Sequence, residues 1–210
     1  MQNVAEAIAL LNKAWPLIAE ECRQVFGGEL HYQAMIYHCL RLSGVPRAQL
    51  GMNVKQWITP VSSPLFKQWA ALKREGMDRL GFEPIPDVVL FKPEIAGDWR
   101  RRRASATIRA MLLAIEVKAS ERDKGRLTSG EITRDIHKLA AHRDEVRFLG
   151  SDVHPVMMVI DTAPIFEERM RPQAVEAVQR IACDTKVSFF YVGPNSEISA
   201  WHTQGDVAAS

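Results

Sequence analysis

Two apolar runs in this chain contain charged residues, although buried strands normally exclude charge. The first run covers residues 84–91 and carries Asp87, and the second covers residues 111–118 and ends with Glu116 and Lys118. Both runs have the length and the near-continuous apolar character of strands that are covered on both faces. An ionised carboxylate removed from water costs several kcal/mol unless it is paired or bound to metal. The charges therefore indicate a functional site at the ends of two strands.

The rest of the chain alternates between helical and strand-like patterns. Apolar residues at helical spacing predict helices over residues 4–26, 29–42, 64–80, 130–148 and 164–182, with Thr128 or Ser129 as the N-cap of the fourth. Further apolar runs predict strands over residues 155–160 and 187–192. This order predicts an α/β fold with a mixed central β-sheet flanked by helices, an extra helical segment, and parallel pairing among the later strands.

Composition bounds the class of protein. The chain has 210 residues, of which 47% are hydrophobic and 25% charged, which suits one well-cored domain with additions. Three widely spaced cysteines, Cys22, Cys39 and Cys183, match neither a disulfide framework nor zinc spacing and favour a reducing compartment. No stretch is long and apolar enough for a membrane span. We expect a cytoplasmic protein with no membrane partner.

The spacing within the second run places two of the charges together. Alternation along a strand puts Glu116 and Lys118 on one face and turns Val117 into the core. If residues 84–91 form the hairpin partner, Asp87 lies across from Glu116. Two carboxylates, a backbone carbonyl and waters suit Mg²⁺ or Mn²⁺, which polarises a phosphoryl oxygen and lowers the pKa of a bound water. A neighbouring lysine then orients that water and offsets developing negative charge.

At this point the residues resemble a known family. Pro86-Asp87 followed by Glu116-Val117-Lys118 looks like the signature of the PD-(D/E)XK nuclease superfamily, whose fold is restriction-endonuclease-like. The resemblance covers roughly residues 29–192 and implies a core of a helix, a three-stranded meander, a helix and a further strand. We expect a nuclease-like domain over residues 29–204, preceded by an N-terminal helix (1–28), and the small, polar residues 205–210 predict a disordered tail. Residues 45–81 would be a helical insertion, and the position of the first strand of the meander between Val45 and Gly81 stays open.

The resemblance also assigns roles to individual residues. It implies that the metal is held by Asp87, Glu116, the Val117 carbonyl and Glu29, and that Lys118 is catalytic. On the helix after the lysine, it implies that Lys138 or Arg134 faces the site. The alternatives are structural: an ion pair at the sheet edge for the strand charges, a first-turn helix residue for Glu29, and an exposed helix face for Lys138 and Arg134.

A run of four arginines lies between the two strand candidates, in the connection formed by residues 92–105. Arg100, Arg101, Arg102 and Arg103 follow Trp99, and together they favour contact with a nucleic-acid backbone over a solvated hairpin tip. The overall net charge of +2 does not by itself indicate a nucleic-acid binder. We therefore expect cleavage to depend on a homodimer or on a partner subunit that supplies recognition.

The sequence thus predicts a Mg²⁺-dependent (or Mn²⁺-dependent) DNA nuclease, with endonucleolytic cleavage favoured, in a defence, restriction or mobile-element system. The alternative is a catalytically inactive protein that keeps the nuclease fold for nucleic-acid binding or as a scaffold. A nucleotide-binding or acyl-transfer enzyme is disfavoured because the chain has neither a Gly-rich phosphate loop nor a Gly-x-Ser-x-Gly elbow.

Overall fold

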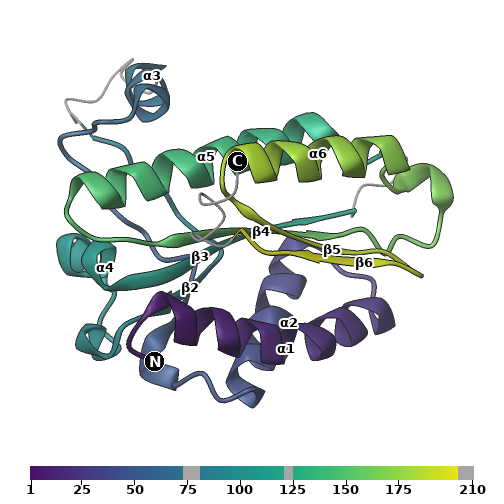
Figure 1. Ribbon diagram of the computed structural model, residues 1–210, viewed down its shortest axis with the longest axis horizontal. Coiled ribbons are helices and arrows are strands. Elements are labelled where there is room, and N and C mark those ends of the chain that lie inside the picture. Colours follow the sequence, from purple (N-terminus) through teal and green to yellow (C-terminus); the bar gives the residue numbers. More distant parts are fainter. Residues whose placement is uncertain (73–80, 121–124, 203–210) are drawn as a thin grey trace, which may run out of the picture.

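A mixed sheet of six strands crosses the protein in the order β1-β2-β3-β4-β5-β6 (Figure 1). The computed structural model describes residues 1–72, 81–120 and 125–202. Its strands are β1 (Leu50–Met52), β2 (Val88–Phe91), β3 (Met111–Ala119), β4 (His154–Ile160), β5 (Ser188–Val192) and β6 (Glu197–Ala200). The first three form an antiparallel meander, β3 to β5 are parallel, and β6 is antiparallel to β5. The predicted α/β class and the parallel later strands are confirmed.

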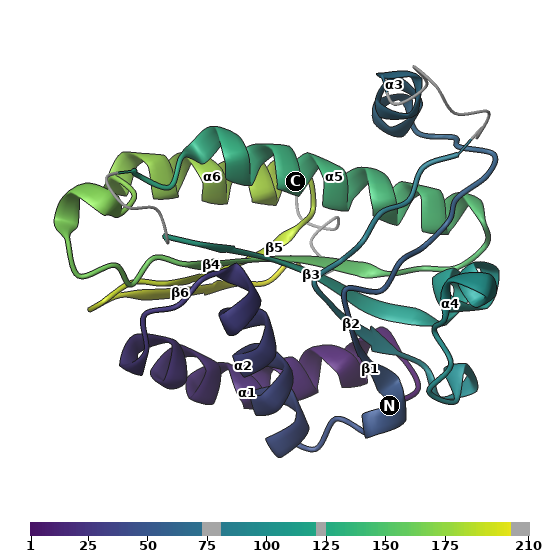
Figure 2. The same ribbon diagram turned by 180° about the vertical axis from the view of Figure 1, so that it is seen from behind.

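Helices cover both faces of the sheet (Figures 1 and 2). On one face lie α1 (Val4–Gln24) and α2 (Glu29–Leu42), and on the other lie α5 (Ser129–Phe148) and α6 (Pro172–Asp184). The helix α3 (Pro64–Leu72) stands outside this layer, next to α5, and α4 (Ala104–Ala110) leads directly into β3. Short 3₁₀ turns occur at Arg47–Gln49, Pro93–Ile95, Arg101–Arg103 and Phe166–Glu168.

The alternation of side chains along each strand divides the apolar core in two. On β3, Ile115 and Val117 belong to the cluster that packs against α1 and α2, whereas Ala114 belongs to the cluster under α5 and α6. All four residues of β2 and all seven of β4 are buried. The sheet is therefore covered on both faces, as the continuous apolar runs predicted.

The start of α5 is fixed by a capping box. The Thr128 hydroxyl accepts a hydrogen bond from the Glu131 backbone N–H, and the Glu131 carboxylate in turn accepts one from the Thr128 N–H. Thr128 is thus the N-cap. The cap fixes where the helix begins, and packing of the helix against the sheet turns Asp135 and Lys138 toward the end of β3.

The structure completes or corrects three sequence-based assignments. The first strand of the meander, whose position between Val45 and Gly81 the sequence left open, is β1, so residues 45–81 contain a core strand as well as helical residues. Residues 92–105 do lie in the connection between the antiparallel strands β2 and β3, where they form two 3₁₀ turns and the start of α4. The last helix begins at Pro172 and not at residue 164, because the Asp161 carboxylate accepts the Met170 N–H and holds the preceding segment as a loop.

Two further predictions concern segments outside the described residues. The helix expected over residues 64–80 is described only as far as Leu72, and the tail 205–210 is not described. Within the described parts of the chain, no helix is both long enough and apolar enough to cross a membrane.

Candidate metal centre

Asp87 and Glu116 face each other across the β2–β3 pair. Val88 pairs with Ile115, and the Asp87 N–H donates to the Ile115 carbonyl at 3.0 Å, which sets Asp87 opposite Glu116. The Asp87 Oδ2 also accepts the Val117 N–H at 2.7 Å. This arrangement is the one that the sequence predicted for the two carboxylates.

Val117 separates the two charged positions of β3. Its side chain is fully buried in the core against α1 and α2, so it faces away from Glu116 and Lys118. In an extended strand the N–H and C=O of one residue point to the same side, so the Val117 carbonyl lies on the Asp87 side of the strand. The Val117 carbonyl would be a third oxygen donor for an ion held by the two carboxylates.

Two lysines and three carboxylates form a continuous line of ion pairs. The Lys118 Nζ lies 3.0 Å from Glu29 Oε2 and 3.3 Å from Asp135 Oδ2. The Lys138 Nζ lies 3.5 Å from Asp135 Oδ1 and 2.6 Å from Glu116 Oε1. The line therefore runs from Glu29 through both lysines to Glu116, and Asp87 lies beside its far end.

The residues of this line come from three elements. Glu29 is the first residue of α2, Lys118 lies near the end of β3, and Asp135 and Lys138 lie three residues apart on α5. The structure thus brings Asp87, Glu116, Lys118, Glu29 and Lys138 together. Arg134, the other sequence-based candidate, is exposed and faces α3.

Asp135 was not assigned a role from the sequence, although it connects the two lysines. It lies on the buried face of α5, in line with Ile132 and Ile136. A charged residue three positions before Lys138 on an otherwise apolar helix face is the signal that identifies it.

The pKa values of both strand carboxyls are raised. Burial raises the pKa of Asp87 to about 6, although the Val117 N–H and both lysines oppose this change. Burial raises the pKa of Glu116 to about 8; the charge of Lys138 opposes this shift and the charge of Asp87 adds to it. Burial would lower the pKa of Lys118, but the hydrogen bond to Glu29 and the charge of Asp135 raise it overall. Lys118 is therefore a cation at neutral pH.

The donor set fits a small, hard divalent cation. In the described residues no three acidic, histidine or cysteine side chains form a metal-binding group by themselves. Mg²⁺ does not require one, because it keeps several waters and is held through one or two carboxylates together with substrate phosphates. Burial raises the pKa of both carboxyls, and a cation held between them would favour their ionised forms. Those two side chains and the Val117 carbonyl would hold the ion, with Glu29 near Lys118.

The four arginines lie at the other end of β3. They precede α4, which leads into β3 at Met111, whereas Glu116 lies roughly 17 Å beyond Met111 at the usual rise per strand residue. Arg100 is paired with Asp98 at 2.6 Å and Arg101 with Glu83 at 2.6 Å. Any contact of Arg100, Arg101, Arg102 and Arg103 with nucleic acid would therefore be remote from the carboxylates.

Comparison with known proteins gives no match: no protein-family model, no curated protein and no solved structure is similar to this chain.

Proposed function

We propose that the protein is a Mg²⁺-dependent nuclease that hydrolyses DNA phosphodiester bonds on a restriction-endonuclease-like core. The observation that carries the proposal is the convergence of Asp87, Glu116 and Lys118 at the ends of adjoining strands. The antiparallel meander β1-β2-β3, preceded by α2 and followed by α5 and β4, has the element order that the resemblance implies.

Each residue has a distinct task in this proposal. Asp87, Glu116 and the Val117 carbonyl hold the cation. When bound, Mg²⁺ supplies a Lewis acid for the phosphoryl group and lowers the pKa of a coordinated water. The Lys118 ammonium orients the attacking water and offsets negative charge that develops on the phosphate in the transition state.

Glu29 and Asp135 position Lys118. The Lys118 ammonium is held between the two carboxylates at 3.0 and 3.3 Å, so its location is fixed before substrate binds. Preorganisation of a catalytic group in this way is a large part of how an active site accelerates a reaction. Because the same contacts keep Lys118 protonated, it acts as a cation and not as a general base.

The alternative function is a nuclease-fold protein that binds nucleic acid or a partner without turnover. The observation that favours it is the ion pair between Lys138 and Glu116, which already supplies one positive charge to the more buried carboxylate. In this alternative Lys138 is a permanent partner of Glu116. In the proposed enzyme its charge lowers the pKa of Glu116, and a bound cation would lower that pKa further.

A plasmid-cleavage assay separates the two functions. Purified protein is incubated with supercoiled and linear DNA in Mg²⁺, Mn²⁺ or EDTA, beside Lys118→Ala and a matched exposed control, Lys67→Ala. If the protein is the proposed enzyme, cleavage should require the cation. Lys118→Ala should abolish cleavage and Lys67→Ala should retain it. Cleavage by Lys118→Ala at the wild-type rate contradicts the assignment. Because the net charge is only +2, the assay is run over a range of protein concentrations to reveal dependence on dimerisation.

A further inference from the structure

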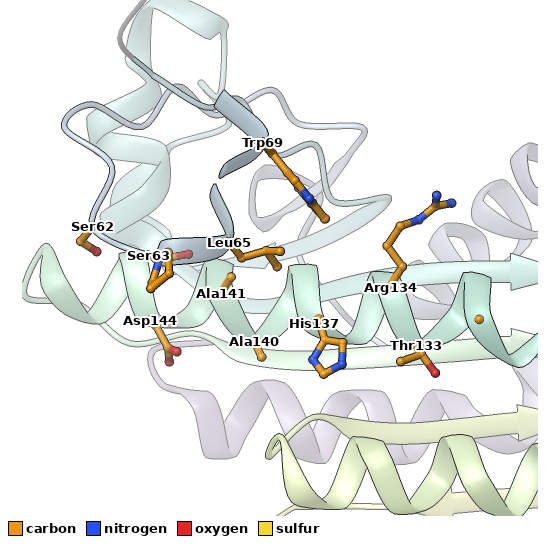
Figure 3. Close-up of a pocket in the computed structure, with 12 residues that line it drawn as sticks. Ser62, Ser63, Leu65, Trp69, Thr133, Arg134, His137, Ala140, Ala141 and Asp144 are labelled. Atoms are coloured by element: carbon orange, nitrogen blue, oxygen red, sulfur yellow. The ribbon is translucent and has the colours of Figure 1, made fainter. Parts of the chain in front are cut away.

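A pocket of about 820 Å³ lies between α3 and α5. Trp69 extends from α3 toward α5, and Arg134 extends from α5 on the opposite side of the opening (Figure 3). Leu65, Ala140 and Ala141 supply apolar surface between them. The volume is in the range of pockets that hold small organic ligands.

The base of α3 is fixed to α5 by a buried carboxylate. Glu145 is fully buried and accepts hydrogen bonds from the Ser62 N–H at 2.8 Å, the Ser62 hydroxyl at 2.8 Å and the Ser63 N–H at 2.6 Å. These donors lie directly before α3, and the first turn of α3 is capped by the Ser63 hydroxyl, which accepts the Phe66 N–H at 3.2 Å. The segment that leads into α3 is therefore fixed to α5, and the N-terminus of α3 is already capped.

Trp69 offers an aromatic surface to the pocket. Its ring packs on one side near Phe66 and Phe82, with ring centroids 6.1 and 5.8 Å away. It is only partly buried and also lines the pocket. An indole held from behind by other aromatic rings is a stable platform, and every nucleobase can stack on such a face.

Arg134 supplies positive charge at the same opening. It is exposed, and among the described residues it makes no ion pair. A guanidinium binds phosphate through two parallel hydrogen bonds. His137, one turn further along α5, also lines the pocket. An aromatic face opposite an available cation suits a nucleotide better than a neutral apolar ligand.

The pocket is next to the candidate metal centre along α5. Arg134 immediately precedes Asp135, and His137 immediately precedes Lys138. Consecutive helix residues differ by about 100° around the axis and 1.5 Å along it. The same two turns of α5 therefore present one set of side chains to the end of β3 and another to the pocket.

We propose that the pocket between α3 and α5 holds an unpaired nucleotide of the substrate strand, with its base on Trp69 and its phosphate on Arg134, so that the substrate contains single-stranded DNA. This inference rests on the proposed nuclease function, because the pocket acts here as a subsite of that centre. It deepens the function by naming the substrate class, which the carboxylates and Lys118 do not define.

Binding of a labelled 20-nucleotide single strand and of the matching blunt duplex, measured by fluorescence anisotropy in EDTA, tests the proposal. We expect wild-type protein to prefer the single strand. Loss of one stacked base weakens binding by about 5- to 150-fold, so Trp69→Ala should fall in that range and Trp69→Phe should retain most of the affinity. Arg134→Gln removes one phosphate contact, so it should lower the slope of log Kd against log salt by about 0.7.

Controls separate binding from folding. Arg134 is exposed, so Arg134→Gln tests the pocket even if Trp69→Ala perturbs α3, and Lys67→Gln removes an exposed charge of α3 outside the pocket. Thermal unfolding of each variant shows whether the fold is kept. Free deoxynucleoside monophosphate is added as competitor: displacement at concentrations near those of the oligonucleotide would show a site for free nucleotides and overturn the strand proposal.

The outcome also distinguishes this proposal from the nuclease function. If Lys118→Ala loses cleavage while Trp69→Ala and Arg134→Gln leave both strand affinity and its salt dependence unchanged, the pocket proposal is wrong and the nuclease stands. If no preparation cleaves DNA but single-strand binding depends on Trp69 and Arg134, the pocket proposal is supported as a binding site and the nuclease function is wrong.

Discussion

The Lys138 ammonium lies 2.6 Å from a carboxylate oxygen of Glu116, a side chain that is only 5% exposed. This ion pair is the shortest contact of the line that also includes Asp135, Lys118 and Glu29. The charge of Lys138 opposes the burial that raises the pKa of Glu116 to about 8. The first prediction follows from it.

Above pH 8, where Glu116 is ionised, Lys138→Met should destabilise the protein in EDTA by about 3 kcal/mol, because it leaves a buried carboxylate without its cation. Chemical denaturation measures the loss, and the double variant with Glu116→Gln should recover much of it. Added Mn²⁺ should stabilise Lys138→Met, since the cation replaces the missing positive charge. Arg134→Met, at an exposed position on the same helix, is the control and should change stability by less than about 0.5 kcal/mol. If Lys138→Met and this control are equally stable, the ion pair between Lys138 and Glu116 contributes nothing to stability.

Asp135→Asn should slow DNA cleavage by about 10- to 100-fold without abolishing it, because Lys118 keeps Glu29 but loses its second positioning contact at 3.3 Å. Single-turnover kinetics under saturating cation measure the chemical step. Asp152→Asn is the matched control: Asp152 lies on the surface and pairs with Arg147. A rate for Asp135→Asn equal to that of the control would remove Asp135 from the site.

The sequence predicted the parts of this centre that depend on interactions between residues close together in the chain. It did not predict the parts that depend on contacts between distant residues. The strands beside Asp87 and Glu116 were recognisable because apolar runs and alternation are local properties, but their register is set by the pairing of Val88 with Ile115 in the folded sheet. The strand β1 could not be recognised from the sequence, because its three residues are too few to show a period and form a strand only by pairing with β2. The edge strand β6 was missed for a similar reason: it has four residues, and none is buried.

The same distinction holds for helices and side chains. Thr128 and the body of α5 follow from local capping and spacing, whereas the loop before Pro172 depends on the contact between Asp161 and Met170, nine residues apart. The choice of Lys138 over Arg134 needed the rotation of α5 relative to the sheet. That rotation is set by tertiary packing, and no local pattern reports it.

Glu145→Gln should loosen α3 and cost about 2–3 kcal/mol of stability, because the amide nitrogen would point a donor at the donors of Ser62 and Ser63. Hydrogen exchange of α3 measures the local effect, which should exceed that in the sheet. Asp144→Asn changes the adjacent, exposed carboxylate and serves as the comparison. Unchanged protection of α3 in Glu145→Gln would show that the carboxylate does not fix the helix.

His142 should make the protein sensitive to acid. Burial, together with the charge of Lys138, lowers its pKa to about 3, and its Nε2 donates to the Gln56 side-chain oxygen at 2.7 Å. In the unfolded chain the pKa is about 6.5. Between these values the unfolded state binds the extra proton, so stability is present above pH 6.5 and is lost as pH falls, by up to about 1.4 kcal/mol per pH unit.

The variant His142→Gln isolates this contribution, because it keeps a donor for Gln56 and removes the titrating ring. Denaturation is measured from pH 7 to pH 4, and the stability difference between wild type and His142→Gln should shrink or reverse toward acid pH. The exposed His137→Gln is the control and should show a constant difference from wild type. A constant difference for His142→Gln as well would contradict the linkage.

The central claim is that Asp87 and Glu116 together bind a divalent cation beside Lys118, and titration calorimetry with Mn²⁺ tests it most directly. The account predicts binding of one Mn²⁺ by wild-type protein and by Lys118→Ala, and loss of that binding in both Asp87→Asn and Glu116→Gln. Absence of Mn²⁺ binding by the wild type, or equal binding by wild type and both carboxylate variants, would contradict it.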